Sequence, residues 1–444
     1  MIETDQDRGA AVGAKQAGAP QLGAQQVGTR QLGAQQADSN QVGASDAAGC
    51  PYHGMAMRRS QPPEVGKRGA RTKTGPPRRE VASMSASRQV LKAAGIAKQD
   101  GFGIREAASS PLRIKPPVLW QDGAEHKAQR TAIAHFFTPM AAKQRYRPVI
   151  ENVADELVGE LESSGRAELT NMAMKLAVAV ASQVVGLTDS TKPGMHERID
   201  AFIALGPSRP SWRPREMLRF LRLQKGIADY FRFDVRPAIA ARRAEPRDDV
   251  ISHLLAQGAG EQDVLIEAIT YGAAGMVTTR EFIAMAAWHL LDDDGLRSRY
   301  LAGDERARQG ILSEIIRLEP VVGRLFRRLD GELELEDEKL DAGTRVTIDV
   351  RAANGDDRAV GPHPLCLDPE RVMSVKGVQG YGLSFGDGPH RCPGSFLALE
   401  EADVFLSRVL SLPGIRLEKP PRLTFNDLIQ GYELRDMWVA ASER

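Results

Sequence analysis

The chain has 444 residues, 42% of them hydrophobic and 26% charged, which is enough to bury a sizeable core in one large domain or in two to three ordinary ones. Lys and Arg total 59 against 58 for Asp and Glu, and this net charge of +1 argues against a surface built as a whole to bind nucleic acid. Three cysteines exclude a disulfide framework and fit a reducing compartment. The sequence has no run of about 18 apolar residues and no basic-then-apolar leader, so it predicts a soluble, cytoplasmic protein without a membrane partner.

The first fifty residues differ in texture from the rest. An aliphatic-Gly-Ala unit recurs there every ten residues, at Val12-Gly13-Ala14, Leu22-Gly23-Ala24, Leu32-Gly33-Ala34 and Val42-Gly43-Ala44. Each unit brings one aliphatic side chain among Gly, Ala and Gln, too little buried surface to offset the entropy of ordering the chain. We expect residues 1–50 to form a disordered tail, with a partner-binding tail as the alternative.

A basic stretch, residues 51–80, follows the repeat. Eight Lys and Arg residues stand against Glu64 between Arg58 and Arg79, with Pro and Gly interspersed. Such a run can bind nucleic acid or an acidic protein surface, but no aromatic residues are interleaved for base stacking. The sequence therefore favours a solvated linker.

From Val81 onward the sequence changes to long amphipathic segments, and we expect residues 81–444 to form one domain. Apolar residues recur at helical spacing in segments 87–94, 128–137, 145–161, 172–185, 216–241 and 261–291. Strand-like sequence is scarce and late, at 332–335 and 345–350, with a turn at 341–343 expected to join the two strands. The pattern predicts a mainly α fold with a minor β component and about a dozen helices.

One Gly-rich segment carries a candidate metal ligand. Phe385-Gly386-Asp387-Gly388-Pro389-His390-Arg391-Cys392-Pro393-Gly394 leads a lone cysteine into the expected start of a helix over 393–410. The helix N-terminus and the loop amides are expected to lower the pKa of the Cys392 thiol and so to favour the thiolate. One cysteine is a poor zinc site, which needs four ligands, whereas a single thiolate suits haem iron. In isolation, such a cysteine is more often simply a buried residue at a helix start.

The flanking residues narrow this choice. The segment resembles the haem-binding signature of the cytochrome P450 family, Phe-x-x-Gly-x-x-x-Cys-x-Gly, with Phe385, Gly388, Cys392 and Gly394 in place. The resemblance implies heme b (iron protoporphyrin IX) as the cofactor, Cys392 as the proximal iron ligand, Phe385 packed near it and His390 at a haem propionate. It runs from about residue 87 to residue 440 and implies the P450 fold, in which the helices surround a buried haem. Residues 81–444 would then be a haem-thiolate catalytic domain.

Other positions occur in the order that this resemblance implies. His126 and Arg130 lie four residues apart, on one face of an expected helix, and resemble the family's His-x-x-x-Arg pair, whose cations meet the propionates. Arg327, at the entry to the sheet, matches another propionate-binding position. Taken alone, the first pair would more often be a solvated helix face.

A second group would have a structural role. Glu314 and Arg317 resemble the family's Glu-x-x-Arg pair, and Arg371 stands where the third member of a buried ion cluster is placed. Removing one partner from such a cluster is strongly destabilising. The cluster would hold the segment that precedes the cysteine loop.

Segment 261–291 would be the long helix that crosses the haem. Ala274 and Gly275 match the small residues where this helix opens for dioxygen, and Thr278 and Thr279 match the family's catalytic threonine pair. The family's acid before the threonines is missing, because Val277 stands in its place.

Two parts of the domain match less well. Residues 58–80 are basic and Pro-rich where the family has apolar strands, so we expect that part of the small sheet to be absent, shortened or displaced. Pocket walls would come from loops around 111–119, 201–214, 321–326 and 428–434, whose sequences do not define a substrate. Arg324 in the third loop is expected to form an outward ion pair.

The resemblance implies a haem-dependent monooxygenase that inserts one oxygen atom from dioxygen into a small organic substrate. Because the chain has no clustered cysteines and no nucleotide domain, we expect electrons from a separate ferredoxin and ferredoxin reductase, and a monomeric enzyme. One alternative, given Val277, is a peroxide-using haem-thiolate oxidase or peroxygenase. The other is a non-catalytic haem binder or sensor.

Overall fold

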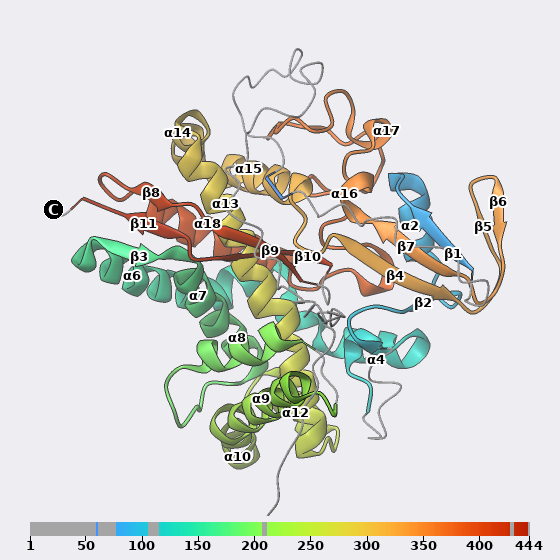
Figure 1. Ribbon diagram of the computed structural model, residues 1–444, viewed down its shortest axis with the longest axis horizontal. Helices are drawn as coiled ribbons and strands as arrows, with labels where there is room; N and C mark the ends of the chain where they lie inside the picture. The colour runs from blue at the N-terminus through green and yellow to red at the C-terminus, as the bar shows by residue number, and fades with distance from the viewer. Residues whose placement is uncertain (1–58, 61–76, 105–114, 207–210, 427–429, 443–444) are drawn as a thin grey trace, which may run out of the picture. The chain divides into compact units, whose positions relative to one another are not determined.

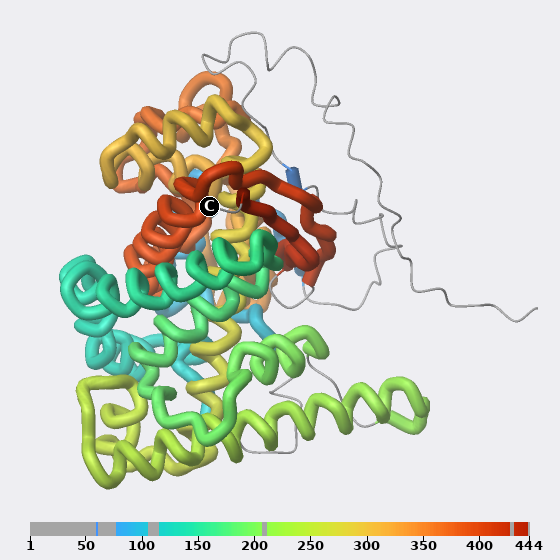
Figure 2. Tube along the Cα trace, turned by 90° about the vertical axis from the view of Figure 1, so that its left-hand side faces the viewer, coloured from blue at the N-terminus to red at the C-terminus, as the bar shows by residue number. Residues whose placement is uncertain are grey.

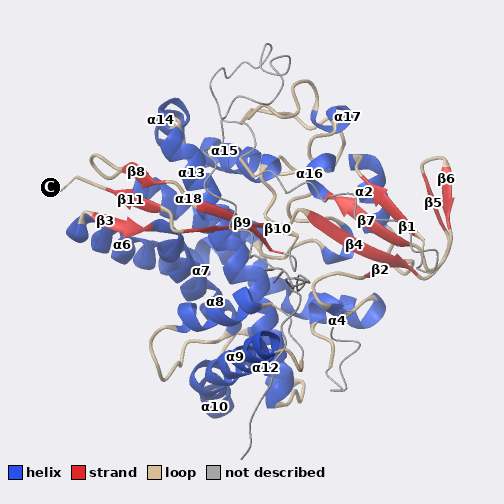
Figure 3. Ribbon diagram, in the orientation of Figure 1, coloured by secondary structure: helices blue, strands red, loops and turns tan. Residues whose placement is uncertain are grey.

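The structure, a computed structural model, describes residues 59–60, 77–104, 115–206, 211–426 and 430–442. The expected tail, residues 1–50, lies outside the described residues, as do parts of the loops at 111–119, 201–214 and 428–434. Helices dominate the described part of the chain, and short strands gather in small sheets, as the sequence predicts (Figure 1, Figure 3).

A run of helices precedes the central one. It comprises α2 (Met84–Lys92), η1 (Val118–Trp120), α4 (Gly123–Ile133), η2 (Ala134–Phe137), α5 (Pro139–Ala141), η3 (Ala142–Tyr146), α6 (Arg147–Ser164), α7 (Leu169–Val185), α8 (Met195–Leu205), α9 (Pro214–Tyr230), η4 (Phe231–Val235), α10 (Arg236–Ala244) and α11 (Val250–Ala256). The central helix consists of α12 (Glu261–Tyr271), the π-helical turn η5 (Gly272–Val277) and α13 (Thr278–Asp292). It is followed by α14 (Asp294–Ala302), α15 (Glu305–Leu318), α16 (Val350–Ala353), α17 (Asp357–Val360), η6 (Gly388–His390) and α18 (Ser395–Leu410).

The strands of the described residues form four small sheets. The four-stranded one has the order β1 (Arg78–Val81), β7 (Arg345–Asp349), β4 (Arg324–Leu329) and β2 (Ala97–Gln99). The three-stranded one has the order β3 (Arg166–Glu168), β11 (Trp438–Ala440) and β8 (Arg416–Lys419). Two hairpins complete the set, one of β5 (Leu333–Leu335) with β6 (Glu338–Leu340) and one of β9 (Arg422–Asn426) with β10 (Gly431–Arg435).

One expectation about the strands is wrong. Strands 332–335 and 345–350 do not pair with each other: β5 turns back at once onto β6, through Glu336 in the left-handed conformation, and β7 pairs with β4 and β1. The end of the basic stretch supplies most of the four-residue strand β1, which runs parallel to β7 at the sheet edge. Arginines are acceptable there because three of the four residues of β1 are exposed and only Val81 is buried.

The core lies where α7 and α13 cross near the middle of the molecule (Figure 2). Both helices bury residues around most of their circumference, as helices surrounded by others do. α7 begins at Glu168, whose carboxylate accepts a hydrogen bond from the Asn171 amide, and it ends at Gly186 with a φ of 96°. A left-handed glycine of this kind is a common helix stop. None of the described helices is long and apolar enough to cross a membrane.

Ser60 departs from the expectation of a solvated linker. Its side chain is fully buried, and its amide and hydroxyl both bond the carboxylate of Glu319 at the end of α15. Arg351 donates to the Ser60 carbonyl oxygen over 2.6 Å, and neighbouring Arg59 pairs with Asp292 at 2.8 Å. This part of the basic stretch therefore completes a buried charge cluster.

Two variants should separate the tail from this anchor. Deleting residues 1–48 should leave the melting temperature unchanged, because the repeat brings little apolar surface to bury. Ser60→Ala should lower the free energy of unfolding by about 1–3 kcal/mol, because buried groups of Glu319 and Arg351 lose a partner. Thermal unfolding followed by circular dichroism measures both. A drop of more than a few degrees in the deletion variant, or no change in Ser60→Ala, contradicts this account.

Candidate functional site

The cysteine loop is a tightly bonded turn between η6 and α18. The Cys392 amide donates to the carbonyl oxygen of Phe385 over 2.8 Å, which closes the loop. Gly388 has a φ of 68°, and a Cβ atom there would overlap the carbonyl oxygen of Leu91 on α2. The glycine of the signature is therefore required by backbone conformation and by close packing against α2.

Cys392 offers a thiol. It is half-buried and free. Burial raises the pKa of the Cys392 thiol, although the Gly394 amide and the charges of Arg130 and Arg391 act in the opposite direction. The expectation of a lowered pKa is therefore wrong for the protein alone. A coordinated metal cation would supply the charge that deprotonates the sulfur.

Three basic side chains that the sequence names separately come together beside this loop. The rings of His126 on α4 and His390 in η6 stack with centroids 4.1 Å apart. Burial lowers the pKa of His126 to about 4, and the positive charges of His390 and Arg130 act in the same direction, so the His126 ring is neutral at pH 7. Arg130 donates to the Arg391 carbonyl oxygen over 2.5 Å, and its charge acts on Cys392.

Asp122 links these groups and was not singled out from the sequence. One carboxylate oxygen lies 3.0 Å from Nε2 of His390, and the other accepts from the Gln99 amide over 3.1 Å. Burial opposes ionisation, but these hydrogen bonds outweigh it and lower the pKa of Asp122. Its position before α4 indicates a helix cap, yet its side chain makes no capping bond.

Arg327 on β4 is the most deeply buried of the cations, with 2% of its surface exposed. It donates to the side chain of Gln99 over 2.6 Å and forms no ion pair with a carboxylate among the described residues. Burial lowers the pKa of Arg327 to about 10, against the more distant charge of Asp122. A buried guanidinium without a counterion favours an anionic ligand, because buried charges are normally paired. Arg328 beside it is exposed. Arg324 forms the expected outward ion pair, with its guanidinium 3.8 Å from the carboxylate of Glu80.

The central helix opens at the position that the sequence indicates. Ala274 and Gly275 in η5 are exposed although Met276 and Val277 beside them are buried, and a Cβ atom on Gly275 would meet open space. The Thr278 hydroxyl donates to the Ala274 carbonyl oxygen over 2.6 Å. Thr278 is half-buried and Thr279 is buried in the helix.

These features fit a haem better than a metal ion bound by side chains alone. No group of three or more His, Cys, Asp or Glu in the described part of the chain is placed to hold a metal. A macrocycle that brings its own four nitrogens needs one further ligand, and Cys392 is a suitable one. The two carboxylates of the haem would neutralise Arg130 and Arg327. The open space at Gly275 would leave room beside the haem.

The expected ion cluster is present behind the loop. Arg317 donates to Glu314 over 2.8 Å and Arg371 donates to the same carboxylate over 3.1 Å, with all three side chains buried. The two arginines also bond backbone carbonyls, among them those of Asn354, Val360 and Cys366. The cluster thus ties α15 to the segment that leads to Cys392.

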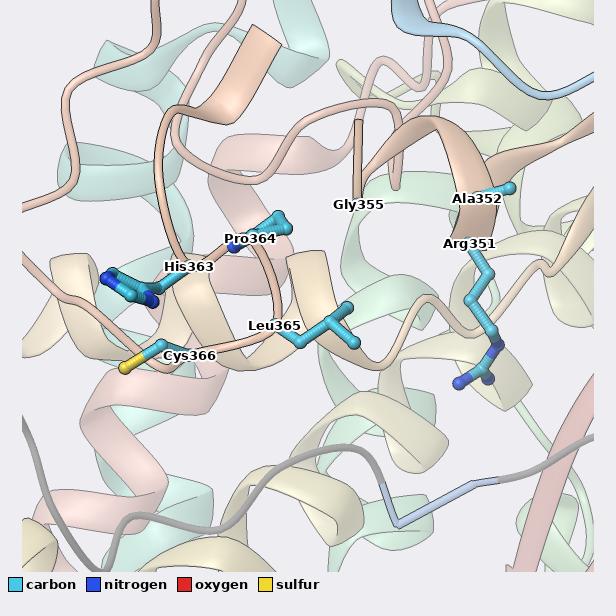
Figure 4. A pocket seen from close by; sticks show the side chains of 7 residues that line it. All are labelled: Arg351, Ala352, Gly355, His363, Pro364, Leu365 and Cys366. Atoms are coloured by element: carbon cyan, nitrogen blue, oxygen red, sulfur yellow. The ribbon is translucent and has the colours of Figure 1, made fainter. Parts of the chain in front are cut away.

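A cavity of about 190 Å³ adjoins this cluster and is separate from the cysteine loop (Figure 4). Its walls are Arg351, Ala352, Gly355, His363, Pro364, Leu365 and Cys366. None of these residues belongs to the candidate haem site. Arg317 donates to the Pro364 carbonyl oxygen over 2.8 Å, so the wall is braced by the ion cluster.

Comparisons with known proteins show which family the chain belongs to. The cytochrome P450 family model matches residues 309–413. Mycinamicin IV hydroxylase/epoxidase of Micromonospora griseorubida is 30% identical over 326 residues, covering 71% of this chain and 77% of that protein. Cytochrome P450(MEG) of Priestia megaterium is 26% identical over 350 residues, 76% of this chain and 81% of that protein. The solved structure of ligand-free CYP164A2 from Mycobacterium smegmatis superposes with a TM-score of 0.65 at 24% identity, covering 82% of this chain and 90% of that one.

A thiol loop, a group of buried cations and an opened central helix define a haem-thiolate enzyme. The chain belongs to the cytochrome P450 family and is of the bacterial type. Members of this family bind heme b and act as monooxygenases.

Proposed function

We propose that this monooxygenase inserts one oxygen atom of dioxygen into a small organic substrate and receives its electrons from a separate ferredoxin and ferredoxin reductase. The observation that carries the proposal is the free thiol of Cys392 with the charge of Arg130 acting on it. Arg327, which has no carboxylate partner among the described residues, and the open space beside Gly275 support it. Cys392 would ligate the iron. The other haem contacts would be His126, Arg130, Ala274, Gly275, Arg327, Phe385, His390 and Gly394. A monomer in the cytoplasm is part of the same proposal.

Each of these residues has a separate role in the proposed reaction. When bound, the haem supplies the iron at which dioxygen is reduced. Cys392, as the thiolate, would hold that iron and donate electron density to it, which favours O–O cleavage. Arg130 and Arg327 anchor the carboxylates of the cofactor. Thr278, whose hydroxyl is held by the Ala274 carbonyl oxygen, is the group that hands a proton into the open face of the helix.

Val277 limits this proton supply. The Val277 side chain has no group that can donate or accept a proton. It is 2% exposed within the apolar core, so it also offers no contact to water. Protons then have to travel through Thr278, ordered water or a polar group of the substrate. With a simple apolar substrate, we expect much of the reducing equivalent to escape as hydrogen peroxide.

Thr278→Ala should therefore impair dioxygen-driven turnover more than peroxide-driven turnover, because added hydrogen peroxide already carries both protons. The ratio of the two product yields should fall about tenfold or more, since general acid help is worth roughly 10²–10⁴ in rate. Thr270→Ala is the matched control, because Thr270 bonds the carbonyl oxygen of Ile266 in the same way on the same helix. Equal ratios in Thr278→Ala and the wild type would refute the relay through Thr278.

Val277 also supports a second candidate, an enzyme that uses peroxide as its working oxidant. Product formation is measured with a ferredoxin, its reductase and dioxygen, and separately with hydrogen peroxide alone. The proposed monooxygenase forms product with the electron-transfer proteins and consumes at least one dioxygen for each product, the excess dioxygen appearing as hydrogen peroxide. Turnover with peroxide alone, and none with the electron-transfer proteins, would favour the second candidate. A protein that shows a haem spectrum but forms no product, either with the electron-transfer proteins or with hydrogen peroxide, would favour a sensor.

A further inference from the structure

The beginning of α9 exposes apolar side chains that the proposed reaction does not use. Seven large hydrophobic residues in the described part of the chain are exposed, and three of them lie between positions 212 and 221. These three are Trp212, Leu218 and Leu221, with 88%, 48% and 55% of their surfaces exposed. Single apolar residues on a surface are ordinary, but a group of them on one helix indicates a binding surface.

The two leucines form a second apolar face of α9. On the first face, Leu223 and Ile227 pack against the core and Tyr230 is fully buried. At about 100° per residue, Leu218 and Leu221 lie on the opposite side of the helix. The N-terminal half of α9 extends past the neighbouring helices in Figure 2, so the second face is left uncovered by the described part of the chain.

Positive charge flanks this second face. Segment 211–230 holds five Lys and Arg residues against two acids. Both acids are paired within the segment, in the ion pairs Arg213–Glu216 and Lys225–Asp229. Arg219 donates to a backbone carbonyl oxygen at the end of α8. Arg215 and Arg222 remain: both are exposed, they lie seven positions apart on one flank of the helix, and neither side chain bonds another described residue.

We propose that this face of α9, formed by Trp212, Arg215, Leu218, Leu221 and Arg222, docks the enzyme onto a membrane surface rich in anionic phospholipid. The leucines would enter the headgroup layer, and the arginines would pair with lipid phosphates. The tryptophan ring would lie at the boundary between water and lipid, where such rings are enriched. This is binding at the surface and needs no spanning helix, but it departs from the expectation of a protein without a membrane partner.

Two other occupants fit this face less well. A second copy of the same face would bring Arg215 and Arg222 against their equivalents, and the like charges would repel. A specific protein partner generally contacts about 20–30 residues on each side of an interface, whereas this face has five. Lipid headgroups adapt to a projecting helix and supply the negative charge that the two arginines lack.

Co-sedimentation of the haem-loaded protein with vesicles tests this. One vesicle is made of phosphatidylcholine alone, and the other of equal parts of phosphatidylcholine and phosphatidylglycerol. Wild-type protein should bind the anionic vesicle about tenfold or more tightly, since each Lys or Arg near an anionic surface adds about fivefold in affinity. Raising the salt concentration from about 0.1 M to about 1 M should remove most of this preference, because the Debye length falls from about 10 Å to about 3 Å. Equal binding to the two vesicles overturns the inference.

Arg215→Gln combined with Arg222→Gln should weaken binding to the anionic vesicle about tenfold or more. The matched control combines Arg306→Gln with Arg358→Gln, which removes the same charge from exposed positions outside α9 and should bind as the wild type does. An equal loss of binding in the two double variants would show that only net charge matters, and it overturns docking through α9.

Leu218→Ser combined with Leu221→Ser tests the apolar part of the face. This variant should bind the anionic vesicle at least about fivefold more weakly, because the leucines no longer transfer apolar surface into the lipid. Leu301→Ser, at an exposed leucine on α14, is the control and should bind as the wild type does. Undiminished binding in the double variant contradicts the inference. Binding of poly-glutamate but of neither vesicle would also overturn it, in favour of an acidic protein partner.

Discussion

Glu314→Ala should lower the free energy of unfolding by about 3–5 kcal/mol and yield protein that retains little haem, because it leaves two buried arginines without their shared acid. Arg317 and Arg371 would keep their bonds to backbone carbonyls but lose the carboxylate that neutralises both. The segment from Asp368 onward also loses a tie, since the Asp368 amide donates to Glu314 over 2.9 Å. Denaturant unfolding and the ratio of haem to protein after purification measure the two effects.

Glu370→Ala is the control for this variant. Glu370 pairs with Arg299 at 2.8 Å, yet its side chain is 78% exposed, so its loss should change stability by less than about 1 kcal/mol. Similar stability losses in the two variants would mean that the buried cluster has no special structural role. Full haem retention in Glu314→Ala would mean that the ion cluster is not needed to hold the cysteine loop in a haem-binding conformation.

Cys392→Ala should abolish substrate oxidation driven by dioxygen, because the variant lacks the free thiol assigned as the iron ligand. The cations beside the loop would still hold the carboxylates of the cofactor, so some haem should be retained. Product analysis under electron supply measures the loss, and the ratio of haem to protein measures retention.

Cys366→Ala is the matched control. Cys366 has its carbonyl oxygen bonded by Arg317 and Arg371, contacts that an alanine backbone preserves. This variant should oxidise substrate at a rate close to that of the wild type. Turnover that persists in Cys392→Ala, or that is lost in Cys366→Ala, would show that Cys392 is not the iron ligand.

The sequence predicts the helices and the cysteine loop well because their signals are local. The central helix, expected over 261–291, is observed over Glu261–Asp292, since apolar periodicity over thirty residues has few alternative explanations. Gly388 is recognisable for a similar reason, because only glycine suits its backbone conformation and its close approach to Leu91. Ala274 and Gly275 lie in the π-helical turn of this helix, and Thr278 and Thr279 begin the segment after it.

Strand pairing could not be predicted in the same way. β1 and β7 are separated by more than 260 residues, and nothing in Arg78-Arg79-Glu80-Val81 indicates a partner. Ser60 is a similar case, because Glu319, to which the buried Ser60 is hydrogen-bonded, lies 259 residues away in the sequence. Long-range polar contacts of this kind have no periodicity to reveal them.

The electrostatics of the site were predicted least well. Helix position alone suggests a lowered pKa for the Cys392 thiol, but desolvation in the folded protein is the larger effect and raises it. The carboxylate of Asp122 stands out only once its partner His390 is known. Burial is a tertiary property, so residues whose function depends on it are the hardest to find from sequence.

The most direct test of the haem-thiolate account is the absorption spectrum of the reduced, carbon monoxide-bound wild-type protein, compared with that of Cys392→His. The account predicts the red-shifted Soret band that gives the family its name in the wild type and its absence in the variant, because the thiolate causes the shift. A wild-type protein that binds haem without this band, or a Cys392→His variant that keeps it, would contradict the account.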